Sequence, residues 1–274
     1  MTDANEWRGR VGASWAAEWR RTDRSFTPLT EHLLKRTREF PFGSVADIGC
    51  GAGELSLAIA RGRPHVKVTG VDISPQLIET ARERGAHLDN ARFEVADAAE
   101  WYPATAPELL VSRHGVMFFD DPVAAFTHLA EVATPAAGLM FSCFRDRAKN
   151  PFYTEVARLL PNAEPAPPAD APGPFAFADR ARVQDLLENS GWGQVAFEPF
   201  DFAMVAGAGD DPVGEAVEYF SVIGPAARAA ADLDPEQRDL FFDRIRELAR
   251  RNLHENIVAL RAATWIVTAR KGDA

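Results

Sequence analysis

Cysteine and long apolar runs are scarce in this chain of 274 residues. Its two cysteines, Cys50 and Cys143, form neither a disulfide framework nor a zinc pattern, and the six histidines show no ligand-type spacing with them. No stretch approaches the roughly 18 uninterrupted apolar residues that suggest a membrane span, and the first residues lack the apolar core of a signal peptide. We therefore expect a soluble, cytoplasmic protein with no structural metal and no membrane span.

Basic residues are outnumbered by acidic ones. Lysine and arginine total 30 against 40 aspartates and glutamates, so the net charge is -10. Because non-specific affinity for nucleic acid comes mostly from lysine and arginine, this balance argues against binding a phosphate backbone. The expected partner is a small molecule. An apolar face on the segments from residue 212 to residue 254 would also allow a homodimer.

Short apolar strands alternate with helices along the chain. Helix starts are expected at Ser74-Pro75 and Asp121-Pro122, where a capping side chain precedes a proline at the first helical position. The alternation predicts an α/β fold with a doubly wound, mostly parallel, seven-stranded sheet. The expected strands are Ser44 to Ile48, Val66 to Val71, Ala91 to Ala96, Glu108 to Ser112, Leu139 to Phe144, Gln194 to Val205 and Thr264 to Arg270.

Three further segments flank or interrupt this pattern. Apolar residues before position 40 recur at helical spacing, with a helix start suggested at Thr27-Pro28, so residues 1–43 are expected to form a helical lid. Residues 44–274 would then form the main domain. Within it, the proline-rich residues 161–174 predict a loop that is a candidate lid, and a helical cap is expected at about 206–262, before the last strand.

A glycine-rich loop follows the first expected strand and opens a helix. Its sequence runs from Asp47 to Gly53 as DIGCGAG. Glycines there permit positive φ and close approach of a ligand, and the helix N-terminus offers unpaired N–H groups. The third glycine comes one residue too early for the dinucleotide pattern G-x-G-x-x-G, which places Glu54 at that position. Asp47 would repel a pyrophosphate but pair with an ammonium, so the loop suits an amino acid group.

Two more aspartates close the next two strands. Asp72 lies twenty-one residues after Gly51, a spacing that favours contact with ribose hydroxyls. Asp97 would reach the same edge of the sheet, near an adenine amino group. The alternatives are ordinary: each aspartate also suits a solvated strand end or a cap of the following turn. Three carboxylates at successive strand ends are nevertheless a stronger signal than the glycine loop alone.

The motifs VADIGCGAG, VTGVDIS, FEVADA and VSRHGVMFFDDP resemble the successive motifs of the class I S-adenosylmethionine-dependent methyltransferases. The resemblance covers about residues 44–145 and is nearest to the small-molecule enzymes related to ubiquinone and menaquinone biosynthesis. It implies a Rossmann-like methyltransferase fold and S-adenosylmethionine as cofactor, with S-adenosylhomocysteine as product. It assigns the cofactor to Asp47, Gly49, Cys50, Gly51 and Gly53 at the methionine end, Asp72 and Ile73 at the ribose, Asp97 and Ala98 at the adenine, and Ser112 and Arg113 at the methionyl side.

His114 follows the fourth expected strand, at the edge where ligands bind in open α/β sheets. It is a candidate general base for a substrate O–H or N–H group, although a histidine that only lines the pocket explains the position equally well. Candidate substrate contacts are aromatic or cationic: Phe118, Phe119, Arg145, Phe152 and Tyr153. Arg113 and Arg145 could instead be ordinary surface residues, and the aromatic residues could serve only in packing.

Methyl transfer to a small organic acceptor is therefore the expected function, with oxygen or nitrogen favoured as the atom methylated and carbon left open. A protein that binds S-adenosylmethionine or S-adenosylhomocysteine without turnover is the alternative, because an intact cofactor loop alone does not imply catalysis. A closed apolar acceptor pocket beside His114 would favour the enzyme.

Overall fold

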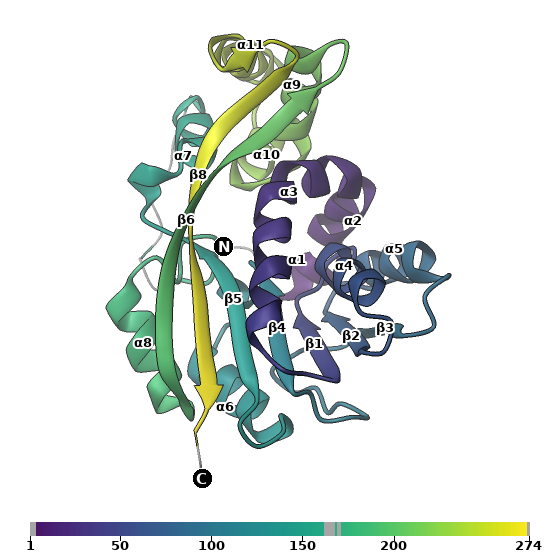
Figure 1. Ribbon diagram of the computed structural model, residues 1–274. Coiled ribbons are helices and arrows are strands. Elements are labelled where there is room, and N and C mark those ends of the chain that lie inside the picture. The colour runs from purple at the N-terminus through teal and green to yellow at the C-terminus, as the bar shows by residue number, and fades with distance from the viewer. Residues whose placement is uncertain (1–3, 162–167, 169–170, 273–274) are drawn as a thin grey trace.

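The computed structural model describes residues 4–161, 168 and 171–272. Seven strands follow the order β3-β2-β1-β4-β5-β8-β6, and a two-residue strand, β7, pairs with β8 (Figure 1). The strands are β1 (Ser44–Ile48), β2 (Lys67–Asp72), β3 (Ala91–Val95), β4 (Leu109–Arg113), β5 (Gly138–Phe144), β6 (Trp192–Ala208), β7 (Leu253–His254) and β8 (Ile257–Lys271). The predicted α/β fold with a mostly parallel sheet is confirmed.

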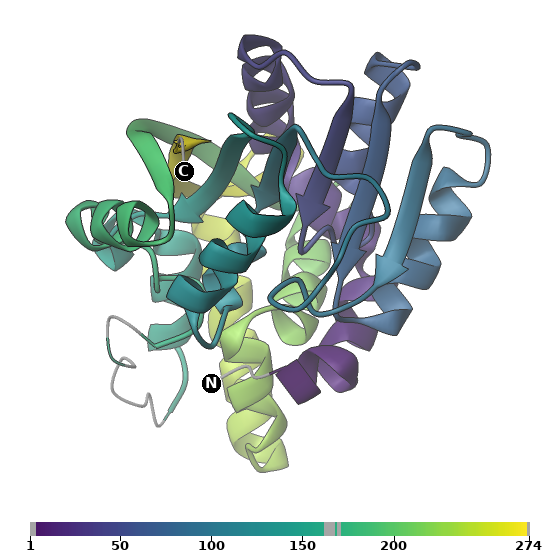
Figure 2. The ribbon, with the colours of Figure 1, turned by 90° about the horizontal axis from the view of Figure 1, so that it is seen from below.

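The parallel and antiparallel parts of the sheet differ in burial and in strand length. Strands β1 to β5 pair in parallel, whereas β8 runs antiparallel to both β5 and β6. All residues of β1 and β5 are buried, because helices cover both faces of this part of the sheet (Figure 2). Strand β8 starts seven residues before the expected Thr264, and together with β6 it forms a long ribbon that extends past the rest of the sheet (Figure 1).

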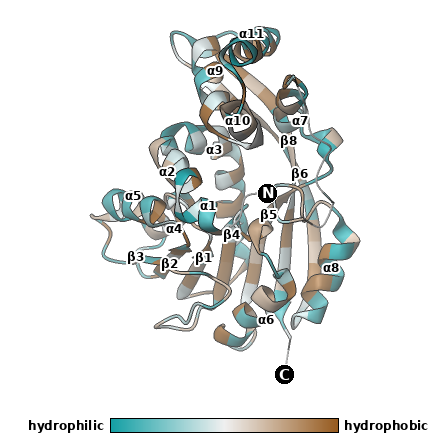
Figure 3. Cartoon of the chain, turned by 180° about the vertical axis from the view of Figure 1, so that it is seen from behind, coloured by the Kyte–Doolittle hydropathy of each residue, from teal (hydrophilic) through white to brown (hydrophobic). Residues whose placement is uncertain are grey.

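The sheet is flanked by α4 (Glu54–Gly62), α5 (Pro75–Gly85), α6 (Pro122–Val132) and α8 (Arg180–Asn189). The two predicted helix starts are confirmed: the Ser74 hydroxyl accepts from Leu77 N, and the Asp121 carboxylate accepts from Ala124 N. Apolar residues concentrate along the strands, and the outer helix α8 is largely hydrophilic (Figure 3). No helix in the described residues is both long enough and apolar enough to cross a membrane.

The N-terminal segment forms α1 (Ala4–Arg8), α2 (Arg10–Ala17), α3 (Trp19–Arg36) and a 3-10 turn, η1 (Thr37–Glu39). The helix start expected at Thr27-Pro28 is wrong, because Pro28 lies inside α3. An interior proline costs a helix about 3 kcal/mol. Burial of Phe26, Leu29 and Leu33 against the sheet outweighs this cost, at roughly 1.5–3 kcal/mol for each side chain.

The remaining helices stand over the carboxyl edge of the parallel strands. After β5 come the short turn η3 (Arg147–Lys149) and α7 (Pro151–Arg158), and η2 (Val116–Phe118) follows β4. Three cap helices join β6 to β7: α9 (Pro212–Val222), α10 (Pro225–Ala231) and α11 (Pro235–Arg251). They lie at the far end of the β6–β8 ribbon (Figure 1), and Gly224, with φ of 93°, separates the first two. Helices are thus present before the last strand, but they span only residues 212–251, and residues 257–262 of the expected cap belong to β8.

Candidate active site

A large cavity opens at the carboxyl ends of β1, β2, β3 and β4, with a volume of about 1700 Å³. This is the edge at which open α/β sheets bind ligands. The N-terminal helices, α7 and the turn between α9 and α10 enclose it from the other side. Of the proline-rich candidate lid, residues 162–167 and 169–170 lie outside the described residues, whereas Ala171 to Pro174 line the cavity.

The glycine loop between β1 and α4 forms one wall of this cavity. Gly49, Gly51 and Gly53 have φ of 64°, 55° and 85°, in the left-handed region that glycine adopts without strain. Gly49, Cys50 and Gly51 line the cavity, and a Cβ added to Gly51 would meet no described atom within 4 Å. Gly53 instead packs against Phe93, so its role is to let the helix approach the sheet.

Asp47 lies under the loop and is 1% exposed. Its Oδ2 accepts a hydrogen bond of 2.6 Å from Ser56 Oγ, whereas its Oδ1 is buried with no partner among the residues described. Burial disfavours the charged form and raises the pKa of this carboxyl to about 6. An unpaired carboxylate oxygen beside a cavity is a site for a cationic hydrogen-bond donor.

Asp72, Ile73, Asp97 and Ala98 all line the cavity, at the ends of β2 and β3. Asp72 Oδ2 accepts from Gly51 N at 2.8 Å, and its Oδ1 accepts from Ser74 N at 2.9 Å. The carboxylate therefore also fixes the glycine loop, and burial raises its pKa. Asp97 is more exposed; its Oδ1 accepts from Ala99 N at 3.0 Å.

Ser112 and Arg113 end β4 but differ in position. Ser112 is buried behind the cavity, where its hydroxyl donates to Ile48 O at 2.7 Å and accepts from Gly115 N at 3.1 Å. It joins the ends of β1 and β4 and does not line the cavity. Arg113 does line it, while its guanidinium donates to Thr30 Oγ1 at 2.8 Å and lies 3.5 Å from Asp23 Oδ1.

His114 is held in an unusual backbone conformation, with φ of 67°. Its ring stacks on Phe144 at a centroid distance of 4.2 Å, and its Nδ1 lies 3.2 Å from Ser142 O. Nε2 is buried and has no hydrogen-bond partner in the part of the chain that the structure describes. Burial, aided by the positive charge of Arg113, lowers the His114 pKa to about 3, so the ring is neutral. A strained residue with an unpaired nitrogen at a cavity is typical of a functional position.

The five candidate substrate residues separate into two groups. Phe118, Phe119 and Tyr153 line the cavity. Phe152 packs into the core against Phe220 at 5.1 Å, and Arg145 pairs with Asp201 at 2.8 Å, so neither belongs to the cavity wall. The described residues contain no group of three or more His, Cys, Asp or Glu side chains arranged to hold a metal ion.

Several residues of the site carry no sequence signal. Trp7 and Phe144 line the cavity, yet neither stands in a motif. Gly115 is the closest neighbour of the glycine loop: a Cβ there would lie 2.6 Å from Ile48 O and 2.8 Å from Gly49 Cα. Only a backbone without a side chain allows the loop after β4 to pack on the loop after β1. The one available signal was the glycine that follows His114.

Residues 45–136 match the family model described as a methyltransferase domain. The chain is 27% identical over 146 residues to malonyl-[acyl-carrier protein] O-methyltransferase 1 of Ilyobacter polytropus, which covers 52% of this chain and 53% of that protein. It is 30% identical over 151 residues to trans-aconitate 2-methyltransferase of Afipia carboxidovorans, with coverage of 54% and 57%. The chain thus spans about half the length of these curated relatives.

Solved structures share the fold. A phosphoethanolamine N-methyltransferase 2 of Haemonchus contortus, solved with S-adenosylhomocysteine, aligns with a TM-score of 0.56 and 15% identity, covering 95% of this chain and 57% of that one. This likeness shows that the chain has the Rossmann-like fold of methyltransferases, the class to which the family match at residues 45–136 also points. The matched segment, residues 45–136, thus resembles a methyltransferase domain, and these curated relatives are methyltransferases.

Proposed function

We propose that the protein transfers a methyl group from S-adenosylmethionine to a small organic acceptor, at oxygen or nitrogen. The observation that carries this proposal is one continuous cavity, in which the glycine loop and the His114 ring face the same space. At about 1700 Å³ it exceeds the roughly 300–1,000 Å³ of a usual small-molecule pocket. It therefore has room for a cofactor and an acceptor together, which a protein that only binds the cofactor does not need.

The residues of the glycine-loop half fit the cofactor. Asp47 Oδ1, buried without a partner among the described residues, would accept from its ammonium group. The Asp72 carboxylate has lone pairs left beyond its two backbone contacts, enough to accept from ribose hydroxyls. Asp97 and Ala98 would hold the adenine. When bound, S-adenosylmethionine would supply a methyl group activated on a sulfonium. The acceptor's lone pair would bond to the methyl carbon, the carbon–sulfur electron pair would stay on sulfur, and the acceptor's O–H or N–H proton would pass to solvent water.

His114 is proposed to orient the acceptor. With a pKa of about 3, its ring is a weak base and does not retain a proton near neutral pH. Its unpaired Nε2 would instead accept a hydrogen bond from an acceptor O–H or N–H group, which directs a lone pair of that atom. When the reactive group is already activated, positioning of the acceptor accounts for much of the rate enhancement. One curated relative is named for methylating trans-aconitate, a small molecule, which supports a small acceptor.

The test is calorimetric titration of the purified chain with S-adenosylmethionine, S-adenosylhomocysteine and NADH, followed by an acceptor screen with labelled methyl. We expect both adenosyl ligands to bind and NADH not to. Asp72→Ala should weaken their binding at least about tenfold, the loss expected when one good polar contact worth about 1.4 kcal/mol is removed. The exposed Asp210→Asn is the control. Binding of NADH alone would contradict the proposal, and adenosyl binding with no methylated acceptor in the screen would favour the non-catalytic binding protein.

A further inference from the structure

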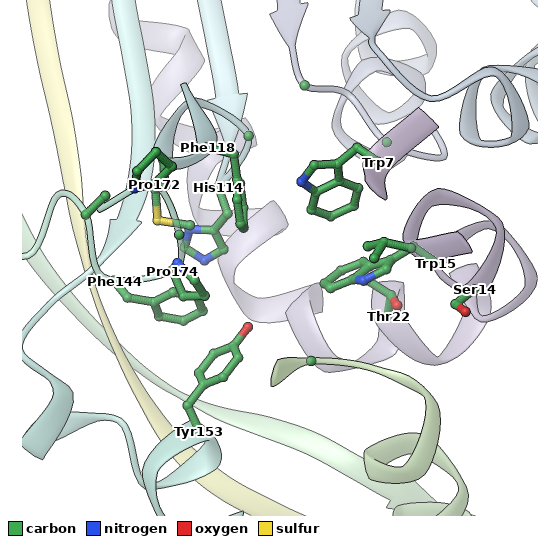
Figure 4. Close-up of a pocket in the computed structure, with 18 of the residues that line it drawn as sticks. Trp7, Ser14, Trp15, Thr22, His114, Phe118, Phe144, Tyr153, Pro172 and Pro174 are labelled. Atoms are coloured by element: carbon green, nitrogen blue, oxygen red, sulfur yellow. The ribbon is translucent and has the colours of Figure 1, made fainter. Parts of the chain in front are cut away.

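Beyond His114, the cavity is walled by aromatic rings that converge from five elements of the fold (Figure 4). Phe144 ends β5 and contacts Tyr153 of α7 edge-on, with ring centroids 5.0 Å apart. Across the cavity, Trp7 of α1 contacts Phe118 of η2 at 5.2 Å. Trp7 also lies 5.7 Å from Trp15 of α2. We call the space between His114 and these five rings the aromatic compartment. Such walls favour flat, conjugated ligands, because rings stack and bury large apolar areas.

The His114 ring presents a hydrogen-bond acceptor to this compartment. Its Nδ1 lies 3.2 Å from the backbone oxygen of Ser142 and 3.3 Å from the Ser142 hydroxyl. A carbonyl oxygen only accepts, so a proton on Nδ1 makes a hydrogen bond there. A bare Nδ1 would accept from the Ser142 hydroxyl but would still face the carbonyl oxygen lone pair to lone pair. The Nδ1–H tautomer is therefore favoured, and Nε2 keeps a lone pair. Because Nε2 has no partner within the described residues, a ligand O–H or N–H group would satisfy it.

Two hydrogen-bond donors face the same space. Trp7 Nε1–H is buried and has no partner in the described chain. The Tyr153 hydroxyl points into the compartment (Figure 4), and burial raises the pKa of this phenol, so it keeps its proton. An indole nitrogen only donates, and it therefore requires an acceptor atom on the ligand. The compartment thus offers one acceptor and two donors on aromatic walls.

The charge of the cavity disfavours an anionic ligand. Its described lining contains eight aspartates and four arginines (Asp23, Asp47, Asp72, Asp97, Asp120, Asp121, Asp146, Asp232; Arg10, Arg113, Arg147, Arg158). Of the arginines, Arg113 already contacts Asp23 and Thr30, and Arg147 lies over the Phe175 ring at 4.6 Å. A negative lining attracts a cationic cofactor and raises the cost of binding a carboxylate close by.

We propose that the aromatic compartment binds an uncharged, planar acceptor of the phenol class, which carries a hydroxyl for His114 Nε2 and a second oxygen for Trp7 Nε1 and the Tyr153 hydroxyl. This inference rests on the proposed function, because it assigns the cofactor to the glycine-loop half of the cavity. The expected acceptor has a hydroxyl hydrogen that His114 can accept, a carbonyl or ether oxygen for the two donors, and a flat conjugated ring that packs against the aromatic walls.

The experiment measures ligand binding rather than turnover. The full chain, with and without saturating S-adenosylhomocysteine, is titrated calorimetrically with 4-hydroxyacetophenone, with 4-acetylbenzoate, in which a carboxylate replaces the hydroxyl, and with tricarballylate. We expect the hydroxy ketone to bind at least about tenfold more tightly than either carboxylate, equivalent to about 1.4 kcal/mol. Equal or tighter binding of the carboxylates would overturn the inference.

Conservative variants identify the site. Tyr153→Phe and Trp7→Phe keep the rings but remove one donor each, so each should weaken binding of the hydroxy ketone roughly 3- to 10-fold, the usual contribution of a hydrogen bond. Tyr102→Phe is the matched control, since Tyr102 is 78% exposed outside the cavity. Unchanged affinity in both donor variants would overturn the inference. Failure to bind S-adenosylhomocysteine would contradict only the proposed function. The ligand preference measured in the absence of S-adenosylhomocysteine would still test the aromatic compartment.

Discussion

Replacing Asp47 by asparagine should stabilise the free protein while weakening its cofactor binding. Burial raises the Asp47 pKa from 3.8 to about 6, so the ionised carboxyl of the folded chain is disfavoured by about 3 kcal/mol, at about 1.4 kcal/mol for each pH unit. The folded chain binds this proton more tightly than the unfolded chain, hence protonation stabilises it. The asparagine side chain of the Asp47→Asn variant would be neutral at every pH and would still offer an oxygen to Ser56 Oγ.

The assay is urea unfolding between pH 4 and pH 8, with cofactor binding measured in parallel. At pH 7 Asp47→Asn should raise the free energy of unfolding by up to about 3 kcal/mol, and the difference should vanish as the pH falls toward 4. Cofactor affinity of the natural chain should fall about tenfold between pH 7 and pH 5, because the fraction of ionised Asp47 falls by that factor. In the variant it should be weak throughout. The reasoning is refuted if the variant is no more stable at pH 7 than the exposed control Asp210→Asn.

Two further substitutions test the packing of the cofactor loop. Gly115→Ala would place a Cβ 2.6 Å from Ile48 O, so it should lower the free energy of unfolding by about 1–3 kcal/mol in urea. The matched control is Gly62→Ala at the end of α4, where an added Cβ meets no described atom within 4 Å. Its free energy of unfolding should differ by less than about 1 kcal/mol from that of the natural chain. Equal urea midpoints for the Gly115 and Gly62 variants would contradict the steric argument. Arg84→Lys should lower the free energy of unfolding by about 1–3 kcal/mol in a thermal unfolding experiment. The reason is that the Arg84 guanidinium donates to Ala52 O and pairs with Asp23, at 2.7 Å each. An unchanged melting temperature would show that these contacts do not stabilise the fold.

The convergence of the proposed cofactor residues on one cavity was predictable because these residues follow one another along the chain. Asp47, Asp72 and Asp97 stand at three successive strand ends, and parallel strands bring their carboxyl ends to one edge. A local pattern of strand, turn and helix therefore fixes where each side chain lies. Ser112 shows the limit of this reasoning: its position at the same edge was correct, but its hydroxyl turns inward to Ile48 O.

Tertiary contacts decide the structure at Pro28 and at Arg145, and local sequence patterns do not contain them. Sequence reasoning therefore expected a helix start at Pro28 and a substrate role for Arg145. At Pro28 the burial of neighbouring apolar side chains overrides a strong local preference. Arg145 meets Asp201 on the facing ribbon, fifty-six residues away. Spacing along the chain does not predict these contacts, because they depend on how β8 and β6 pair beside β5 in the sheet.

The acceptor half of the cavity depends on how the N-terminal helices dock. Asp23 of α3 pairs with Arg84 of α5 at 2.7 Å, and Arg24 of α3 pairs with Glu215 of the cap helix α9 at 3.0 Å, so α3 is held between the cofactor loop and the cap. Trp7 and Trp15 reach the aromatic compartment only through this docking. The same helices therefore cover the proposed cofactor site and supply part of the proposed acceptor wall. This explains why the motifs of residues 45–136 indicate the family, while the chemistry of the proposed acceptor can be inferred only from the assembled fold.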